Sequence, residues 1–398
     1  MGFSEVPLGE LVRKCATWSP KVSGSEKFDY IDLSSVDKGK KEVTAIEQLL
    51  CSEAPSRARQ LVKENDVLVA TVRPNLNGVA IVGKEHDGMT ASTGYCVLRP
   101  IPEKLNPRFL FHWVKTGIFV KRMVNVASGA NYPAVSDAKV KASTIPFPPL
   151  VEQERIAAIL DQADTLRGNR REAVEQLDTL LKSTFFDMFG DPITNPHNFP
   201  MRTLSEFYIN KKEGTKCGPF GSALKKGELV TSGIPVWNMD NIDSTGRMVL
   251  PFRMWITDDK FQKLESYSVV NGDVLISRAG TVGKMCVAAM GGERSIISTN
   301  LIRVRFGADL LPIYFVSLMT YCKGRVGRLK TGPDGAFTHM STGVLDKIKF
   351  PYPSIDLQYR FAAIVESAEQ QKALMCAHLA ELDALFASLQ HRAFNGEL

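Results

Sequence analysis

The sequence contains no long apolar run and no apolar signal segment at its N-terminus. A membrane-spanning helix needs about 20 consecutive apolar residues, and no stretch approaches that length. The first six residues include a charge at Glu5, where a secretory signal would begin its apolar core. We therefore expect a cytoplasmic protein that does not contact a membrane.

Paired metal-ligating residues are also missing. The seven cysteines are an odd number and include no CxxC pair, and the six histidines form no HxxxH or HxE arrangement. Zinc sites and disulfide frameworks depend on such pairs. We expect scattered reduced thiols and no metal site.

Familiar catalytic motifs are missing as well. A phosphate-binding loop requires GxxxxGK followed by Ser or Thr, whereas residues 280–285 have the wrong spacing and end in methionine. No GxGxxG is present, and Asn195-Pro196-His197 is not the Asn/Asp-Pro-Pro-aromatic element of an adenine methyltransferase. The chain is therefore expected to have no catalytic residues and to bind no cofactor itself.

An internal repeat at an offset of 205 residues is the main feature that the sequence does contain. Ile-Pro-Phe-Pro at 145–148 matches Phe-Pro-Tyr-Pro at 350–353, and the match continues without a gap. Identical pairs include Gln153 with Gln358, Arg155 with Arg360, Ile159 with Ile364, Leu177 with Leu382, and Leu180 with Leu385.

Upstream of these segments the repeat is weaker. Residues 66–68 resemble 273–275. Arg73, Gly78 and Val82 align with Arg278, Gly283 and Val287 at the offset of 205 residues. The chain therefore divides into globular and helical segments in alternation, at 1–150, 151–190, 191–350 and 351–398. The globular copies differ more from each other than the helices do. This indicates two domains that recognise different targets and are attached to one common scaffold.

Both helical segments carry apolar residues in alternating steps of three and four, which predicts a coiled-coil seam. The first seam comprises Ile156, Ile159, Ala163, Leu166, Ala173, Leu177 and Leu180, with a break at Arg170. The second comprises Phe361, Ile364, Ala368, Met375, His378, Leu382, Leu385 and Leu389, with a break at Gln371. Each helix of about 35 residues would extend roughly 50 Å. We expect them to pack on each other antiparallel; the alternative is that each packs on its own globular neighbour.

The globular segments mix short β-like runs with amphipathic helical stretches. This pattern predicts an α+β protein: two α/β domains with largely antiparallel sheets, joined and spaced by two long antiparallel coiled-coil helices as a pseudo-two-fold repeat. Residues 1–150 carry 20 basic and 15 acidic side chains, and residues 191–350 carry 21 and 14, whereas both helical segments are net acidic. Basic domains favour a polyanion such as nucleic acid.

Four motifs resemble the specificity subunits of type I restriction–modification systems. They are PPLVEQERIAAIL at 148–160, FFDMFGDP at 185–192, KCGPFGSAL at 216–224 and RAFNGEL at 392–398. The resemblance covers essentially the whole chain, including its two-fold layout, and the helix motifs are specific. One departure is DLQY at 356–359, where the first helix has VEQE at 151–154.

This resemblance implies a non-catalytic protein with two target recognition domains, each reading one half of a split site in double-stranded DNA. It implies two helices that hold these domains apart and dock two copies of a methyltransferase subunit. Those partners would bring S-adenosylmethionine and methylate adenine, and a separate translocase and nuclease subunit would use ATP and Mg²⁺.

The family places base readers on loops and sheet faces of each globular half. Candidates in the first half are Arg73, Asn75, Asn77, Asn131 and Tyr132. Candidates in the second half are Ser277, Arg278, Lys284, Arg325, Arg328, Lys330 and His339, with Phe337 nearby. Arginine suits guanine and asparagine suits adenine in the major groove. Each candidate could instead contact a phosphate or only solvent, and Phe337 could belong to a core.

Two other classes of function stay open at this point. One is an assembly protein whose globular halves bind proteins; it would lack the steep salt dependence of DNA binding. The other is a nucleic-acid enzyme whose site these motifs do not reveal, and it would show methyl transfer or DNA cleavage by the isolated chain.

Overall fold

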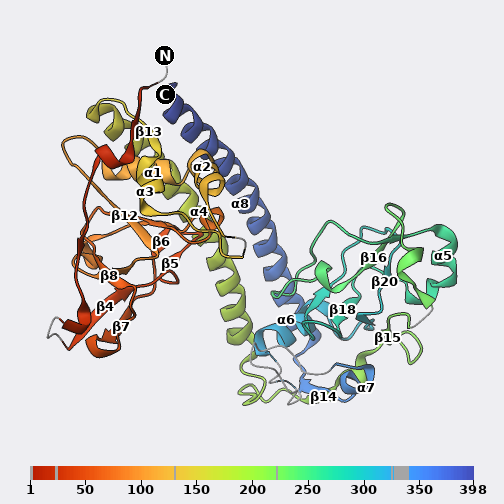
Figure 1. The fold of residues 1–398 in the computed structure, drawn as a ribbon. Helices are drawn as coiled ribbons and strands as arrows, with labels where there is room; N and C mark the ends of the chain where they lie inside the picture. Colours follow the sequence, from red (N-terminus) through yellow and green to blue (C-terminus); the bar gives the residue numbers. More distant parts are fainter. Residues whose placement is uncertain (1–2, 23–25, 130, 221–222, 324–325, 327–339) are drawn as a thin grey trace. The chain divides into compact units, whose positions relative to one another are not determined.

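The computed structural model describes residues 3–22, 26–129, 131–220, 223–323, 326 and 340–398, and the chain forms two compact units (Figure 1). Unit 1 comprises Met1–Ala173 and Met375–Leu398, and unit 2 comprises Val174–Leu374. Each unit holds one globular half and part of each long helix. These helices are α4 (Leu150–Phe189) and α8 (Ile355–Asn395), close to the predicted 151–190 and 351–398.

The globular half of unit 1 contains two main sheets. One has the strand order β10-β9-β12-β2, and all its pairs are antiparallel. Its strands are β2 (Val12–Arg13), β9 (Val67–Ala70), β10 (Val79–Ile81) and β12 (Tyr95–Pro100). The other has the order β3-β8-β11-β4-β7, in which β4 and β11 run parallel. Its strands are β3 (Ala16–Thr17), β4 (Lys27–Ile31), β7 (Glu47–Leu50), β8 (Ala58–Leu61) and β11 (Thr90–Ser92).

Short helices and strand pairs complete this half. Helices α1 (Pro107–Val114), α2 (Gly117–Val126) and α3 (Asp137–Ala142) follow β12. Two-stranded pairs join β1 (Glu5–Pro7) to β13 (Thr144–Pro146), and β5 (Val36–Asp37) to β6 (Glu42–Val43). Strand β9 lies between two cores because its side chains alternate: Val67 and Val69 pack with Phe109 of α1, and Leu68 faces Val97 on the other side.

The globular half of unit 2 repeats this plan. Its larger sheet has the order β15-β21-β18-β19, with β15 (Thr215–Cys217), β18 (Val274–Ser277), β19 (Met285–Val287) and β21 (Leu301–Val304). The smaller sheet has the order β17-β16-β20, with β16 (Ile234–Trp237), β17 (Trp255–Ile256) and β20 (Ile296–Ile297). The other elements are β14 (Met201–Thr203), β22 (Lys349–Pro351), α5 (Asp258–Lys263), α6 (Pro312–Cys322) and α7 (Thr342–Leu345).

A buried ion pair marks the same place in both halves. In unit 1, Arg99 of β12 donates to both carboxylate oxygens of Asp66, at 2.8 and 2.7 Å. In unit 2, Arg305 donates in the same way to Asp273, at 2.7 and 2.8 Å. Both carboxylates lie just before the central strand of their sheet and are almost fully buried. The globular halves are therefore copies of one framework, as the sequence repeat predicts.

A buried glutamine at the start of each long helix also repeats. The Gln153 side chain accepts from the backbone N–H of Asn106 at 2.9 Å, just before α1, and donates to the carbonyl of Pro148 at 3.0 Å. Gln358 accepts from the N–H of Leu311, just before α6, at 2.9 Å. Each glutamine thus fixes its long helix to the short helix of the same globular half.

The strand register corrects part of the sequence alignment. Val67 pairs with Leu98 as Val274 pairs with Val304, which sets β9 and β18 at an offset of 207 residues. The N–H of Thr71 donates to Gly94 as that of Arg278 donates to Asn300. Arg278 therefore corresponds to Thr71, and its predicted equivalence with Arg73 is wrong because the two connecting loops differ in length.

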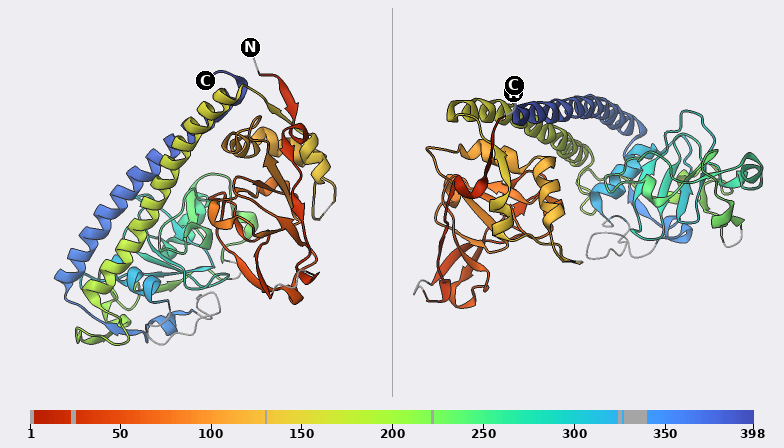
Figure 2. Two further views of the ribbon diagram at one scale, coloured as in Figure 1. Left: turned by 90° about the vertical axis from the view of Figure 1, so that its left-hand side faces the viewer. Right: turned by 45° about the horizontal axis from the view of Figure 1, so that its top comes forward.

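The two long helices lie side by side with opposite chain directions in each unit, as predicted (Figure 2). In unit 1, Arg167 of α4 donates to Asp383 of α8 at 2.6 Å. In unit 2, Lys372 of α8 donates to Asp178 of α4 at 2.7 Å. The helices also pack on the globular halves, so that both packing arrangements weighed from the sequence occur. Phe394 near the end of α8, for example, lies 5.1 Å from Phe109 of α1, ring centre to ring centre.

The assignment to the seam is wrong for four residues whose side chains are exposed: Leu166, Leu180, Ile364 and Leu385. The buried positions include Leu160 and Leu181 in α4 and Val365 and Phe386 in α8, each pair separated by 21 residues, or three heptads. Ile156 and Phe361 are buried as predicted, and Ile159, Leu177 and Leu382 are half-buried.

The error has a physical cause in the middle of the helices. Between its buried ends the true seam contains charged residues, among them Arg167 and Lys372, which pair with Asp383 and Asp178. An apolar pattern breaks at such positions. An apolar pattern alone therefore does not separate the buried positions from exposed neighbours such as Leu166 and Leu180.

Candidate nucleic-acid interface

The first-half candidates gather in two loops at the end of β9. The backbone N–H of Arg73 donates to the carbonyl of Pro133 at 2.7 Å, and its guanidinium lies 4.9 Å above the ring of Tyr132. Arg73, Asn75, Asn131 and Tyr132 are all exposed. These side chains are accessible to a ligand.

Asn77 has a different environment. Its side-chain amide donates to the carbonyl of Lys115 at 3.2 Å, and its own carbonyl accepts from the Lys41 ammonium at 2.6 Å. Burial lowers the pKa of Lys41. These bonds tie the loop to the rest of unit 1, so Asn77 supports the exposed loop.

In the second half Ser277 is fully buried, which corrects its assignment as a DNA contact. Its hydroxyl donates to the carbonyl of Thr281 at 2.6 Å and accepts from the N–H of Lys284 at 2.9 Å. Ser277 therefore closes the loop and presents no atom at the surface. Lys284 is half-buried, with its ammonium 3.4 Å from the carbonyl of Ile242.

The remaining second-half candidates are placed differently. The guanidinium of Arg278 lies 4.7 Å above the ring of Phe220, which is 56% exposed. Arg325, Arg328, Lys330 and His339, together with Phe337, lie outside the described residues.

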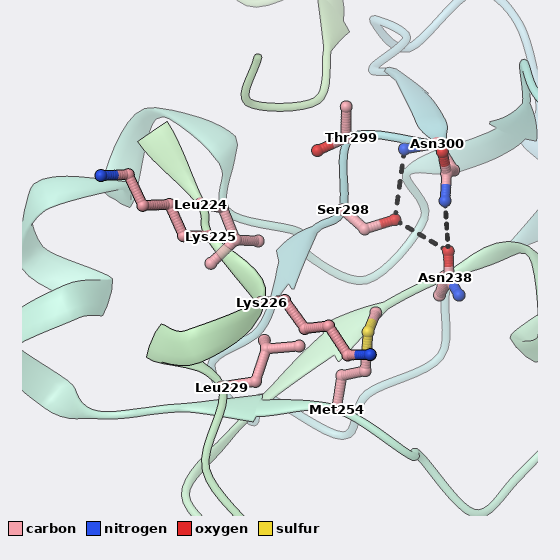
Figure 3. Close-up of a pocket in the computed structure, with 9 residues that line it drawn as sticks. All are labelled: Leu224, Lys225, Lys226, Leu229, Asn238, Met254, Ser298, Thr299 and Asn300. Carbon is pink, nitrogen blue, oxygen red and sulfur yellow. Dashed lines mark hydrogen bonds between the residues drawn. The ribbon is translucent and has the colours of Figure 1, made fainter. Parts of the chain in front are cut away.

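Sequence reasoning missed a group of polar side chains, of which Figure 3 shows Asn238, Ser298 and Asn300. We call Asn238, Arg278, Ser298 and Asn300 the polar corner. The oxygen Oδ1 of Asn238 accepts from the hydroxyl of Ser298 at 3.1 Å and from Nδ2 of Asn300 at 3.2 Å. The carbonyl of Asn300 accepts from the N–H of Arg278 at 2.9 Å.

The polar corner forms because several strands end at one place. Asn238 follows β16, Ser298 follows β20, Asn300 precedes β21 and Arg278 follows β18. A sequence signal for it existed. Ser-Thr-Asn at 298–300 resembles Ser-Thr-Gly at 92–94 at an offset of 206 residues, one more than the offset of 205 residues between the helices.

No cluster of three or more metal-ligating side chains occurs in the part of the chain that the structure describes. Within that part, no helix combines the length and apolar character needed to cross a membrane.

The helices expose apolar side chains at repeated positions. Leu180 on α4 and Leu385 on α8 are 55% and 51% exposed and stand at equivalent places in the repeat. One exposed leucine thus stands at the equivalent helix position in each unit.

Comparisons with known proteins agree with this layout. Residues 23–176 match the family model of the type I restriction modification DNA specificity domain. The specificity subunit of the type I restriction enzyme MjaVIII from Methanocaldococcus jannaschii is 23% identical over 322 residues, which cover 78% of this chain and 73% of that protein. The EcoKI specificity subunit of Escherichia coli is 22% identical over 405 residues, covering 94% of this chain and 83% of that protein.

Solved structures show the same fold. A chain from a study of complex assembly in a type I restriction–modification system aligns with a TM-score of 0.61 at 24% identity, covering all of this chain and 98% of that one. The S subunit of a type I restriction–modification system from M. genitalium aligns with a TM-score of 0.55 at 16% identity, covering 99% of this chain and 96% of that one. In its family-model match over residues 23–176, and in its sequence similarity over most of its length, the chain is similar to the specificity subunits of type I restriction–modification systems.

Proposed function

We propose that this chain reads a two-part, gapped site in double-stranded DNA, one part with each globular half. We further propose that α4 and α8 dock two copies of an adenine methyltransferase subunit, and that a translocase and nuclease subunit joins the same complex. Catalysis, together with S-adenosylmethionine, ATP and Mg²⁺, belongs to those partners. The chain itself contributes recognition and assembly.

The observation that carries this proposal is one framework built twice with different exposed side chains. The buried pairs Asp66–Arg99 and Asp273–Arg305 hold the two sheets in the same way. The exposed loops differ: Arg73 and Tyr132 mark the first half, and Arg278 and Phe220 mark the second. Two copies with a common interior and different surfaces suit two different half-sites.

Charge supports a nucleic-acid ligand over a protein ligand. Both globular segments carry a net positive charge, whereas both helical segments are net negative. Phosphate neutralisation by Lys and Arg releases counterions, so DNA affinity should fall steeply with salt. Binding that stays constant between 50 and 200 mM salt, roughly the range over which such complexes weaken most, would instead favour an assembly protein.

Domain exchange tests the proposal most directly. Residues 1–150 are replaced by the corresponding segment of a relative, the complex is assembled with its methyltransferase subunit, and methylated adenines are mapped on genomic DNA. We expect one half-site to change and the other to stay the same. A change in both half-sites, or a site without two parts, contradicts the proposal. The isolated chain serves as the control and should neither methylate nor cut DNA.

A further inference from the structure

The first globular half holds an arginine in a backbone conformation that glycine would adopt more easily. Arg73, three residues after β9, has a φ of 52° and a ψ of 61°, which lie in the left-handed region. A side chain disfavours this region, and such residues persist only where their surroundings hold them. Here the N–H of Arg73 donates to the carbonyl of Pro133 at 2.7 Å, and its own carbonyl accepts from the N–H of Leu76 at 2.9 Å. The backbone therefore sets the direction in which the arginine side chain leaves the loop.

A neighbouring loop places an aromatic ring against this side chain. Ser128 and Ala134 exchange two backbone hydrogen bonds, each of 2.9 Å, and Ala134 also pairs with Val72. Tyr132 lies between them in the chain, and its ring centre is 4.9 Å from the central carbon of the Arg73 guanidinium. A ring in this position restricts a guanidinium without occupying its N–H donors. Tyr132 is itself 68% exposed, so the pair stands at the surface.

The N–H donors of this guanidinium are available to a ligand. Arg73 is exposed, and within the described ranges its guanidinium has no hydrogen-bond or ion-pair partner. The two chain segments that meet here, 67–83 and 115–136, contain four basic residues and no acidic one. A cation with unused donors, and with no carboxylate in these segments to compete for it, suits a ligand that offers negative charge and hydrogen-bond acceptors, as DNA does.

The second half has an arginine at a related place but holds it with different residues. Arg278 directly follows the central strand β18 and lies 4.7 Å above the ring of Phe220, which follows β15. Tyr132, in contrast, follows α2. An arginine above an exposed ring, after the central strand, is thus common to both halves although its residues are not equivalent. Because the Nη1 atom of Arg278 is buried, Arg73 is the more accessible of the two arginines.

The way in which Arg73 is held favours base reading over contact with a phosphate. A phosphate contact requires mainly positive charge, which a mobile lysine also provides. Arg73 is instead fixed by its backbone and by the ring of Tyr132, which is the pre-organisation that selective recognition requires. Guanine presents O6 and N7 side by side in the major groove, and these acceptors match two adjacent N–H groups of one guanidinium. Both donors belong to a single planar group, so no second side chain has to be placed beside it.

We propose that Arg73 reads a guanine in the half-site that unit 1 contacts. Two adjacent N–H groups of its guanidinium donate to O6 and N7 of that base in the major groove. Tyr132 is a positioning residue, because its ring acts on the base only through Arg73. This inference rests on the proposed DNA-reading function, and it names a residue that carries out part of that function in unit 1.

The test combines protein variants with altered guanines. Arg73→Ala removes the donors, Tyr132→Ala removes the ring, and Tyr132→Phe keeps the ring. Arg13→Ala is the matched control, because Arg13 pairs with Arg99 at the opposite end of the same sheet and its ion pair with Glu103 is exposed. Circular dichroism establishes that each variant is folded.

The exchange of residues 1–150 identifies the half-site that unit 1 reads. Binding of the assembled complex is then measured on duplexes in which 7-deazaguanine, which lacks N7, replaces each guanine of that half-site in turn. In a second series inosine replaces the same guanines; it keeps O6 and N7 and lacks only the amino group in the minor groove.

We expect Arg73→Ala to weaken binding to the natural site roughly 5- to 150-fold, and Arg13→Ala to leave it unchanged. One 7-deazaguanine position should weaken binding by the wild type and have no further effect on Arg73→Ala. Inosine at that position should bind as guanine does, because the contact lies in the major groove.

Tyr132 is tested by its effect on discrimination. Tyr132→Phe should behave as the wild type, whereas Tyr132→Ala should reduce the difference between guanine and 7-deazaguanine at this one position. A ring that only stabilised the fold would change binding to all duplexes by the same factor, and such a uniform change overturns the positioning role.

The remaining results separate the proposed function from the assignment of Arg73. A wild-type complex whose methylated-adenine map shows no two-part site contradicts the proposed function itself. A two-part site with no guanine in the half that unit 1 reads overturns only the assignment of Arg73. The assignment also fails if 7-deazaguanine affects the wild type and Arg73→Ala equally at every position, because Arg73 then contacts a phosphate or no part of the DNA.

Discussion

The carboxylate of Asp273 is almost fully buried and accepts three hydrogen bonds. Two come from Arg305 at 2.7 and 2.8 Å, and one comes from the backbone N–H of Val270 at 2.8 Å. The charge is thus matched and its oxygens are occupied, although it lies in the interior. Removing one member of such a pair leaves the other charge buried without compensation.

We expect Asp273→Ala to lower the free energy of unfolding by about 3–5 kcal/mol, measured by urea denaturation followed by circular dichroism. Asp258→Ala is the control, because the Asp258–Arg294 pair is exposed and exposed ion pairs contribute little. Equal loss of stability in both variants would show that burial does not set the importance of the Asp273 pair.

His112 gives the fold a predicted dependence on pH. Burial lowers the pKa of His112, although its Nε2 lies 2.8 Å from a carboxylate oxygen of Asp161. In the unfolded chain His112 takes up a proton near its ordinary pKa of about 6.5, whereas in the folded chain it does so only at lower pH. The unfolded state binds more protons between these two values, so stability falls as pH drops through that range.

The measurement is the urea midpoint at pH 7.5 and at pH 5.5, for the wild type and for His112→Gln. We expect the wild type to lose more stability than the variant over this interval, because the variant lacks the titrating group. A variant that loses as much as the wild type would assign the pH dependence to other groups.

At the scale of the helices, neighbouring leucines have opposite surroundings. Leu181 is buried in the core of unit 2, whereas Leu180 is more than half exposed. The repeat gives the same contrast in unit 1, between buried Phe386 and exposed Leu385. One position of each pair holds the fold, and the other is free to contact a partner.

We expect the double variant Leu180→Asp and Leu385→Asp to fold normally and to bind the methyltransferase subunit at least about tenfold more weakly, because it places charge on both apolar surfaces. Leu181→Asp should instead unfold unit 2. Ile193→Asp is the control, since Ile193 is equally exposed but lies outside the helices. Full methyltransferase binding by the folded double variant, measured by sedimentation, would contradict the docking proposal.

At the scale of the whole molecule, shortening the paired helices offers a way to change the gap between the two proposed half-sites in DNA. Residues 167–173 of α4 lie beside residues 377–383 of α8, where Arg167 and Arg171 both donate to Asp383. Deleting both segments removes one heptad from each helix, so that the seam stays in phase while each helix shortens by about 10 Å.

If the helices set the distance between the two readers, this paired deletion should shorten the gap by about three base pairs at 3.4 Å each, or abolish binding if the new rotation about the duplex does not fit. The methylated-adenine map gives the answer. A folded variant that keeps the original gap would show that the helices do not determine the spacing.

The sequence by itself determined the features that depend on local pattern and on repetition. The 205-residue offset predicted two globular halves and two long helices, and identical residues such as Gln153 and Gln358 do hold equivalent places in the two copies. Only the tertiary structure decided which face of each helix is buried, since the seam at Arg167 and Lys372 is charged and is recognised only with its partners, Asp383 and Asp178. The polar corner also needed the fold: Asn238, Arg278 and Asn300 are distant in sequence, and it is the pairing of β16 with β20 and of β18 with β21 that brings them together.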